Sequence, residues 1–206
     1  MNPLSTIKGT IISGVVLAIV IALIVAVLAK TGIGFNTPSF IMWLHVLAGV
    51  TWIGMLYYFN FVQVPALAAA AKDQGGPGGA GISKYVAPRA LVWFRWGAVF
   101  TWLTGAGYLG HIGLLGDAFT LGLGPNGTLL GTYIGVGAWL GTIMLFNVWV
   151  LIWPNQKKIL GMVDATAEQI AKARRIAFLA SRTNTVLSIP MVMSMVSFGH
   201  AGFFLR

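Results

Sequence analysis

The fold of this chain is decided by an uninterrupted apolar run near its N-terminus, where residues 11–29 read IISGVVLAIVIALIVAVLA. The run contains no charged residue, and about 20 apolar residues are enough to cross a bilayer as a helix. A backbone in lipid must satisfy its own hydrogen bonds, and barrel strands show much shorter alternating runs, so this run indicates a helix. The sequence therefore predicts an integral membrane protein.

Further apolar runs follow this one along the chain. We expect transmembrane spans at about 11–29, 40–62, 90–115, 128–153 and 178–204. Hydrophobic residues make up 57% of the chain and charged residues only 8%, whereas a soluble domain has about 25% charged residues. We expect a single all-α domain, 1–206, built as a bundle of about five helices. Pro154 is expected to end the fourth helix, and 164–177 to form a short surface helix capped by Asp164 or Thr166.

The basic residues are distributed unevenly between the two sides of the predicted spans. With the N-terminus in the cytoplasm, the inner flanks hold Lys8, Lys72, Lys84, Arg89, Arg95, Lys157, Lys158, Lys172, Arg174, Arg175 and Arg182, and the outer side only Lys30 and Arg206. Cytoplasmic flanks of membrane proteins are enriched in Lys and Arg. This asymmetry predicts a cytoplasmic N-terminus, a periplasmic C-terminus and a multi-pass protein of the bacterial inner membrane. It also accounts for the net charge of +9 without nucleic acid as a partner.

Small and amide side chains indicate how the helices pack. The fourth span contains Gly131-x-x-x-Gly135 followed by Gly137-x-x-x-Gly141, a pattern that lets another backbone approach closely. The neighbour is either another helix of the bundle or a further subunit. Asn60, Asn147 and Asn184 lie within or at the ends of spans, where interhelical hydrogen bonding is the usual role of such side chains.

The chemistry open to the chain is limited by what the spans lack. The four acidic residues, Asp73, Asp117, Asp164 and Glu168, all fall in predicted loops, so no intramembrane carboxylate is available for a proton relay or a di-iron site. With 0 cysteines, thiolate metal sites and the covalent attachment of a c-type haem are excluded.

Three histidines remain as candidate ligands. His45, His111 and His200 each lie near the predicted outer end of a span, at a similar depth, and neutral imidazole is a common ligand of haem iron and copper. Trp52 follows His45 by two helical turns on the same face. We expect a b-type haem, with His45 and His200 as metal ligands and His111 as a further candidate. Copper is the second choice, and each histidine has an interfacial, hydrogen-bonded role as the ordinary alternative.

Arg95 is the remaining candidate for cofactor binding, near the inner end of the third span. Its long side chain can reach the cytoplasmic interface while its stem stays in lipid. The alternative is an anion clamp for a haem propionate, a lipid phosphate or an anionic substrate.

Several strings resemble the membrane domain of bacterial urate hydroxylases, the urate oxidase N-terminal type. They are WLHVLAGVTWIG at 43–54, YYFNFV at 57–62, WFRW at 93–96, NVWVLIWPNQKK at 147–158 and RTNTVLSIP at 182–190. The resemblance implies a membrane redox protein whose full-length relatives oxidise urate and pass electrons to a fused cytochrome c. This sequence contains no C-x-x-C-H motif, so we expect any cytochrome c acceptor to be a separate protein.

The leading hypothesis is a membrane-embedded oxidoreductase or electron-transfer protein that holds a b-type haem near the outer face. The alternative is a cofactor-free accessory subunit that packs its glycine-rich helix faces against a larger membrane complex. Expected partners are the lipid bilayer together with either a separate cytochrome c or that complex.

Overall fold

The computed structural model describes residues 2–30, 32–200 and 202 of the chain. Every regular element within these ranges is helical. The chain forms two compact units, residues 1–37 and 38–206, and each is described by itself. The last residues of the fifth predicted span and Arg206 lie outside the described ranges.

The first unit contains α1 (Ile7–Leu28), preceded by a single 3₁₀ turn at Pro3–Ser5. Thr6 caps α1, because its Oγ1 accepts a hydrogen bond of 3.0 Å from the backbone N–H of Gly9. The helix is apolar around its whole circumference and buries none of its side chains. A helix that is hydrophobic on every side is typical of a membrane span.

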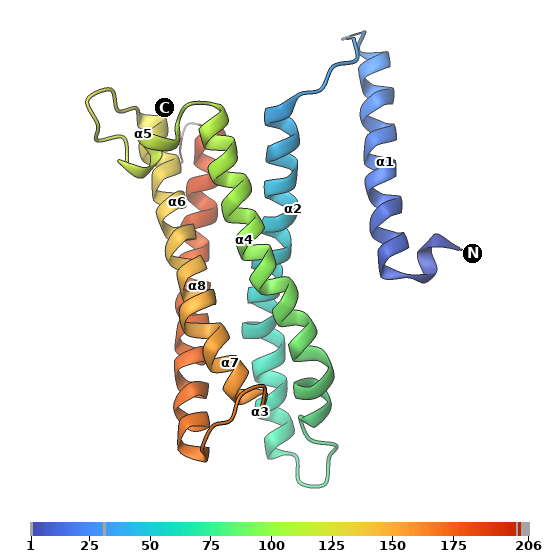
Figure 1. The fold of residues 1–206 in the computed structure, drawn as a ribbon, viewed down its shortest axis with the longest axis vertical. Coiled ribbons are helices and arrows are strands. Elements are labelled where there is room, and N and C mark those ends of the chain that lie inside the picture. The colour runs from blue at the N-terminus through green and yellow to red at the C-terminus, as the bar shows by residue number, and fades with distance from the viewer. Residues whose placement is uncertain (1, 31, 201, 203–206) are drawn as a thin grey trace. The chain divides into compact units, whose positions relative to one another are not determined.

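The second unit is a bundle of four helical rods that run side by side (Figure 1). The first rod joins α2 (Thr37–Tyr57), η2 (Tyr58–Gln63) and α3 (Val64–Lys72). The second joins η3 (Ile82–Val86) and α4 (Ala87–His111), and is followed by the short α5 (Leu115–Phe119). The third joins α6 (Leu129–Phe146), η4 (Asn147–Ile152) and α7 (Trp153–Ile159), and the fourth is α8 (Ala167–His200).

Three of these rods contain a π-helical segment, and each segment ends just before a proline. Pro65, Pro88 and Pro154 lie in the first turn after η2, η3 and η4. Proline cannot donate its backbone nitrogen to the preceding turn and its ring crowds that turn, so a locally widened π turn absorbs the conflict. The expectation that Pro154 ends the fourth helix is therefore wrong, because the rod continues through η4 to Ile159.

The predicted spans all fall on helices, with some differences in extent. Among the described residues, four helical segments are long and apolar enough to cross a membrane: Ile7–Leu28, Thr37–Lys72, Leu129–Ile159 and Ala167–His200. The third predicted span coincides with α4, which is less apolar, and its crossing of the membrane stays a prediction. The separate surface helix expected at 164–177 is wrong, because these residues lead directly into α8. Thr166 does cap that helix, and its N–H and Oγ1 exchange hydrogen bonds with Gln169.

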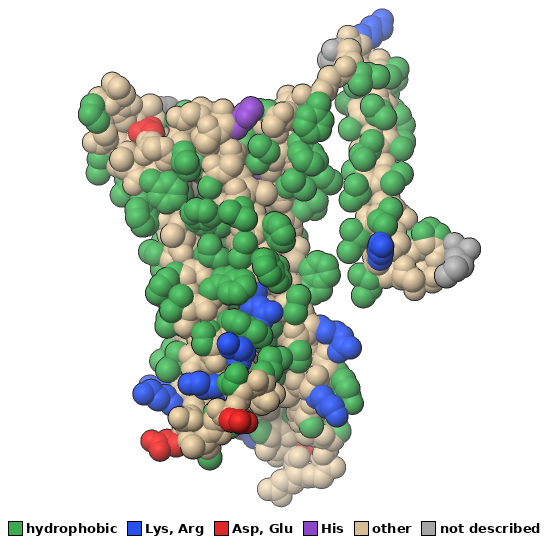
Figure 2. Space-filling view, viewed as in Figure 1, with side chains coloured by type: hydrophobic (Ala, Val, Ile, Leu, Met, Phe, Trp, Pro, Cys, Tyr) green, Lys and Arg blue, Asp and Glu red, His purple; other side chains and the backbone are tan. Residues whose placement is uncertain are grey.

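The two ends of the bundle differ in charge. The end formed by η3, α3, α7 and the first turns of α8, here called the basic end, carries Lys72, Lys84, Arg89, Lys157, Lys158, Lys172, Arg174 and Arg175. Figure 2 shows Lys and Arg side chains, in blue, gathered on the lower part of the bundle, below a broad apolar band. The loop at the opposite end, residues 112–128, contains no Lys or Arg. This asymmetry is the one expected from the sequence for a membrane protein.

The glycines of α6 allow close packing against other helices of the same chain. A Cβ on Gly131 would lie 2.1 Å from the carboxylate of Asp117, and one on Gly135 would lie 2.2 Å from the carbonyl oxygen of Ala118, so α5 rests directly on this pair. A Cβ on Gly137 would lie 2.9 Å from Ser194 Oγ on α8. The interpretation of these glycines as packing sites inside the bundle is confirmed.

The α2 and α4 helices approach each other closely at Gly97. A Cβ there would lie 3.2 Å from the backbone nitrogen of Trp52 and 3.3 Å from its Cα, and Trp52 itself is almost completely buried. Both obstructing atoms belong to the backbone, so a side chain at position 97 can be accommodated only by moving a helix. Gly97 therefore sets the distance between α2 and α4.

We expect Gly97→Ala to lower the melting temperature of the detergent-purified protein, because overpacking of this kind costs about 1–3 kcal/mol. Gly107→Ala is the matched control, since position 107 lies on the same helix with nothing within 4 Å of the added Cβ. The control should be neutral or slightly stabilising, because alanine favours a helix over glycine by roughly 1 kcal/mol. Equal melting temperatures for the two variants would contradict the close crossing.

Candidate functional site

An apolar cavity of about 660 Å³ lies between α2, α4, α6 and α8, on the side of the bundle away from the basic end. Five glycines line it and leave room that side chains would otherwise fill: Gly49, Gly54, Gly105, Gly137 and Gly141. Within the described part of the chain, no Asp, Glu, Lys or Arg lines it. Ligand pockets of roughly 300–1,000 Å³ with a few placed polar groups are typical binding sites for small molecules and cofactors.

His45 is the only histidine among the described residues that lines this cavity. Its Nδ1 lies 2.9 Å from the backbone carbonyl oxygen of Thr101 on α4. A carbonyl oxygen can only accept, so Nδ1 carries the proton and donates to it, and the Nε2 of a neutral ring keeps its lone pair. Metal-binding histidines in proteins are usually held in this way, with the second ring nitrogen donating to a carbonyl or carboxylate.

Gly105 provides the space that the His45 ring occupies. A Cβ at this position would lie 2.9 Å from Cε1 and 3.1 Å from Nδ1 of the imidazole. Any other residue would press on the ring and on its hydrogen bond to Thr101. The α4 backbone therefore both makes room for the imidazole and fixes its orientation.

Trp52 lines the same cavity from α2, two turns after His45, as the seven-residue spacing predicts. The side chain is 1% exposed, and its Nε1–H has no hydrogen-bond partner within the described structure. A buried donor without an acceptor is uncommon and costs free energy. An acceptor on a bound molecule would satisfy it.

The other two histidines do not join His45. His111 ends α4 and His200 ends α8; both are exposed, and neither lines the cavity. The Nδ1 of His200 lies 3.0 Å from the carbonyl oxygen of Val196 in its own helix. No group of three or more His, Cys, Asp or Glu side chains suited to a metal occurs among the described residues. The ligand roles of His111 and His200 stay predictions.

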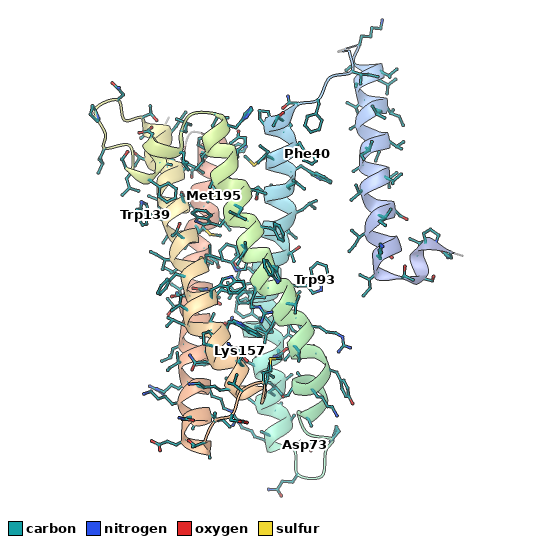
Figure 3. The ribbon with its side chains drawn as sticks, in the orientation of Figure 1. Phe40, Asp73, Trp93, Trp139, Lys157 and Met195 are labelled. Atoms are coloured by element: carbon teal, nitrogen blue, oxygen red, sulfur yellow. The ribbon has the colours of Figure 1, made fainter. Side chains whose placement is uncertain are left out.

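The α8 wall of the cavity contains two methionines that the sequence did not single out as a pair. Met191 and Met195 on α8 both line the cavity, whereas Met193 does not. The four-residue spacing that places them on one helical face was the available signal. Figure 3 shows the labelled Met195 in the upper half of the bundle, well away from the labelled Lys157.

Arg95 lies outside the lining of the cavity. Its guanidinium carbon is 3.3 Å from the ring centroid of Trp153, in the part of the bundle nearer the basic end. The structure thus brings His45 and Trp52 together at the cavity and places Arg95 in a different environment. Its predicted role in cofactor binding is not tested by this placement.

A layer of buried polar side chains separates the cavity from the basic end. Tyr57 lines the cavity, and its hydroxyl lies 3.0 Å from Ser188 Oγ. Further along, Asn60 donates to Ser181 Oγ at 2.7 Å, and Asn147 donates to Asn184 Oδ1 at 2.8 Å. The expectation that the three asparagines form interhelical hydrogen bonds is confirmed. These bonds tie α8 to the rods on both sides of it.

Together, the long apolar rods, the apolar outer surface and the internal polar pairing define a multi-pass helical membrane protein with a half-open apolar cavity. Residues 128–205 match the family model described as urate oxidase N-terminal, which confirms over α6–α8 the resemblance seen in the sequence. The match includes the strings at 147–158 and 182–190 but neither α2 nor α4. No curated protein and no solved structure matches the chain.

We expect Asn184→Ala to lower the stability of the folded protein by about 1–3 kcal/mol. Asn184 is 0% exposed and donates to the carbonyl oxygen of Met144 at 3.0 Å while accepting from Asn147, so its removal leaves the side-chain amide of Asn147 without this acceptor and takes one hydrogen bond from the Met144 carbonyl. Thr183→Ala, at the exposed neighbouring position, is the control for thermal unfolding. An unchanged melting temperature for Asn184→Ala would show that the polar layer contributes nothing.

We expect Gly105→Ala to displace the His45 ring and break its hydrogen bond to Thr101, because the new methyl group would contact the imidazole. NMR spectra of protein labelled with ¹⁵N-histidine report which ring nitrogen carries the proton. The wild-type protein should show His45 protonated at Nδ1, and the variant should show a mixture of ring forms. Gly110→Ala on the same helix, where the added Cβ has open space, should leave the His45 signals unchanged.

Proposed function

We propose that this chain is a membrane-embedded redox protein whose cavity between α2, α4, α6 and α8 would hold a b-type haem, with His45 as a ligand of its iron. The observation that carries the proposal is the state of the His45 ring. Its Nδ1–H is engaged by the Thr101 carbonyl, and the ring borders an apolar cavity of about 660 Å³. This arrangement suits a nitrogen ligand for iron.

The shape and chemistry of the walls support a flat, largely apolar cofactor. Gly49 and Gly54 leave open backbone on α2, Gly105 makes room for the His45 ring, and the indole of Trp52 provides an aromatic wall beside it. The thioethers of Met191 and Met195 are soft donors on the facing wall. No Lys or Arg of the described residues lines the cavity. The cavity therefore suits the macrocycle and the metal of a haem, but it offers no basic side chain to the haem carboxylates.

Within this proposal, the haem supplies one-electron chemistry when bound. The residues of the chain would hold it: His45 would bind the metal, Thr101 fixes the orientation of the imidazole, and the apolar walls would limit the access of water. Burial and ligand identity are the means by which a protein sets the potential of such a group.

The orientation of the bundle supports an electron partner outside the cytoplasm. We infer five spans, with the N-terminus in the cytoplasm and the C-terminus in the periplasm of a bacterial inner membrane. The concentration of Lys and Arg at the basic end supports this topology (Figure 2). The cavity then lies toward the periplasmic face, where a separate cytochrome c, the acceptor implied by the family resemblance, could exchange electrons.

We expect the detergent-purified wild-type protein to show a reduced b-type absorption spectrum, with about one haem per chain in a pyridine haemochrome assay. His45→Ala should lose most of this haem, because it removes the only histidine that borders the cavity. A featureless spectrum from well-folded wild-type protein would contradict the proposal and would favour the cofactor-free accessory subunit instead.

The variants His111→Ala and His200→Ala are the matched controls, since both side chains are exposed outside the cavity. Retention of haem with an unchanged spectrum would exclude both as ligands. A change from a six-coordinate low-spin to a five-coordinate spectrum in either one would identify it as the second axial ligand. Full haem retention in His45→Ala would contradict the assignment of His45 as a ligand of the iron.

A further inference from the structure

A second candidate site lies around Arg95, toward the basic end and apart from the cavity. The guanidinium carbon of Arg95 lies 3.3 Å from the ring centroid of Trp153 and 5.9 Å from that of Trp149. Both Nε and Nη1 of Arg95 are buried, and neither has an acceptor among the described residues. The cation therefore rests on aromatic rings while two of its nitrogens remain without hydrogen-bond acceptors.

Two further groups, an indole N–H and an ammonium, lie in the same cluster. Trp149 Nε1 is also buried without an acceptor, and the ammonium of Lys157 lies 5.8 Å from the same Trp153 ring that Arg95 stacks on. Arg95 on α4 and Lys157 on α7 thus place two positive charges around one indole. The four acidic residues of the chain lie in loops, in α5 or in the first turn of α8, so the bundle itself supplies no carboxylate here.

Unpaired donors next to a concentration of positive charge suit an anion with several oxygen acceptors. A planar guanidinium is well matched to phosphate and carboxylate oxygens, which can accept two of its N–H groups at once. The Trp149 Nε1–H adds a neutral donor close by, and the Lys157 ammonium adds charge. Phosphate oxygens provide more acceptors than a carboxylate for such a set.

The surface around this cluster indicates that the phosphate belongs to a lipid. Trp96, whose ring meets Trp149 edge-on at 5.7 Å between centroids, is exposed, as are Phe146 and Val150 on the neighbouring rod. These apolar side chains face outward beside the cationic cluster, in the direction that lipid occupies around a membrane protein. Acyl chains can lie on them while the headgroup phosphate approaches the half-buried Arg95 side chain from its exposed part. Figure 3 shows Lys157 near the basic end of the bundle, where headgroups of the inner leaflet would lie.

We propose that Arg95, Trp149 and Lys157 bind the phosphate of an anionic phospholipid at the basic end of the bundle, a site separate from the cavity and independent of haem binding. The test uses delipidated full-length protein in detergent, titrated with phosphatidylglycerol and followed by native mass spectrometry. We expect one lipid to remain bound to the wild type under conditions that strip the others, and Arg95→Gln to weaken its binding at least tenfold. Trp149→Phe, which removes only the N–H donor, and Lys157→Gln should each weaken binding by a smaller factor.

Arg89→Gln is the control with the same change of charge on the same helix, because Arg89 already donates to the carbonyl oxygen of Tyr85 at 2.6 Å. It should bind the lipid as the wild type does, and circular dichroism melting confirms that every variant is folded. A uniform loss of affinity in all the variants would mean diffuse attraction to the basic end and would overturn the proposal. Displacement of the lipid by millimolar inorganic phosphate would overturn the lipid as the source of the phosphate, and absence of any retained lipid would overturn the site.

Discussion

The contact between Gly97 and the backbone of Trp52 is the constraint on which the rest of the bundle depends. It brings α2 and α4 together where no side chain intervenes, and the α4 lining of the cavity begins one turn later, at Thr101. On one side of this contact the helices enclose space, and His45 reaches the Thr101 carbonyl. On the other side Leu56 and Phe94 fill the core completely. On α4, this contact therefore lies between the packed part of the helix and the part that lines the cavity.

Much of the fold could be predicted from the sequence, because the bilayer imposes a simple rule on composition. Long apolar runs located the helices, and the glycine and asparagine positions identified packing and hydrogen-bonding contacts that the structure contains. The continuation of the helix through Pro154 could not be predicted in the same way. Proline usually ends a helix, and only the local widening at η4, which depends on the surrounding packing, allows the chain to continue.

The candidate site was predicted less completely than the fold. Similar depth in the membrane suggested that His45, His111 and His200 lie together, but depth does not determine the direction in which a side chain points around its helix. His45 faces the cavity because Gly105 makes room for its ring, whereas the other two end their helices at the exposed rim. The match to the urate oxidase N-terminal family covers the α6 and α8 walls of the cavity and not the α2 wall that carries His45.

The π-helical turn at η4 has a consequence for the orientation of everything that follows it in the third rod. One extra residue in a helix turns all later side chains by about 100° relative to an α-helical continuation. Trp153 and Lys157 both follow this turn, and Arg95 stacks on the face of Trp153 that the turn presents to α4. The π turn at η4 therefore determines which side of α7 faces α4. A chain shortened by one residue there would keep all the same side chains and turn a different side of α7 toward the guanidinium.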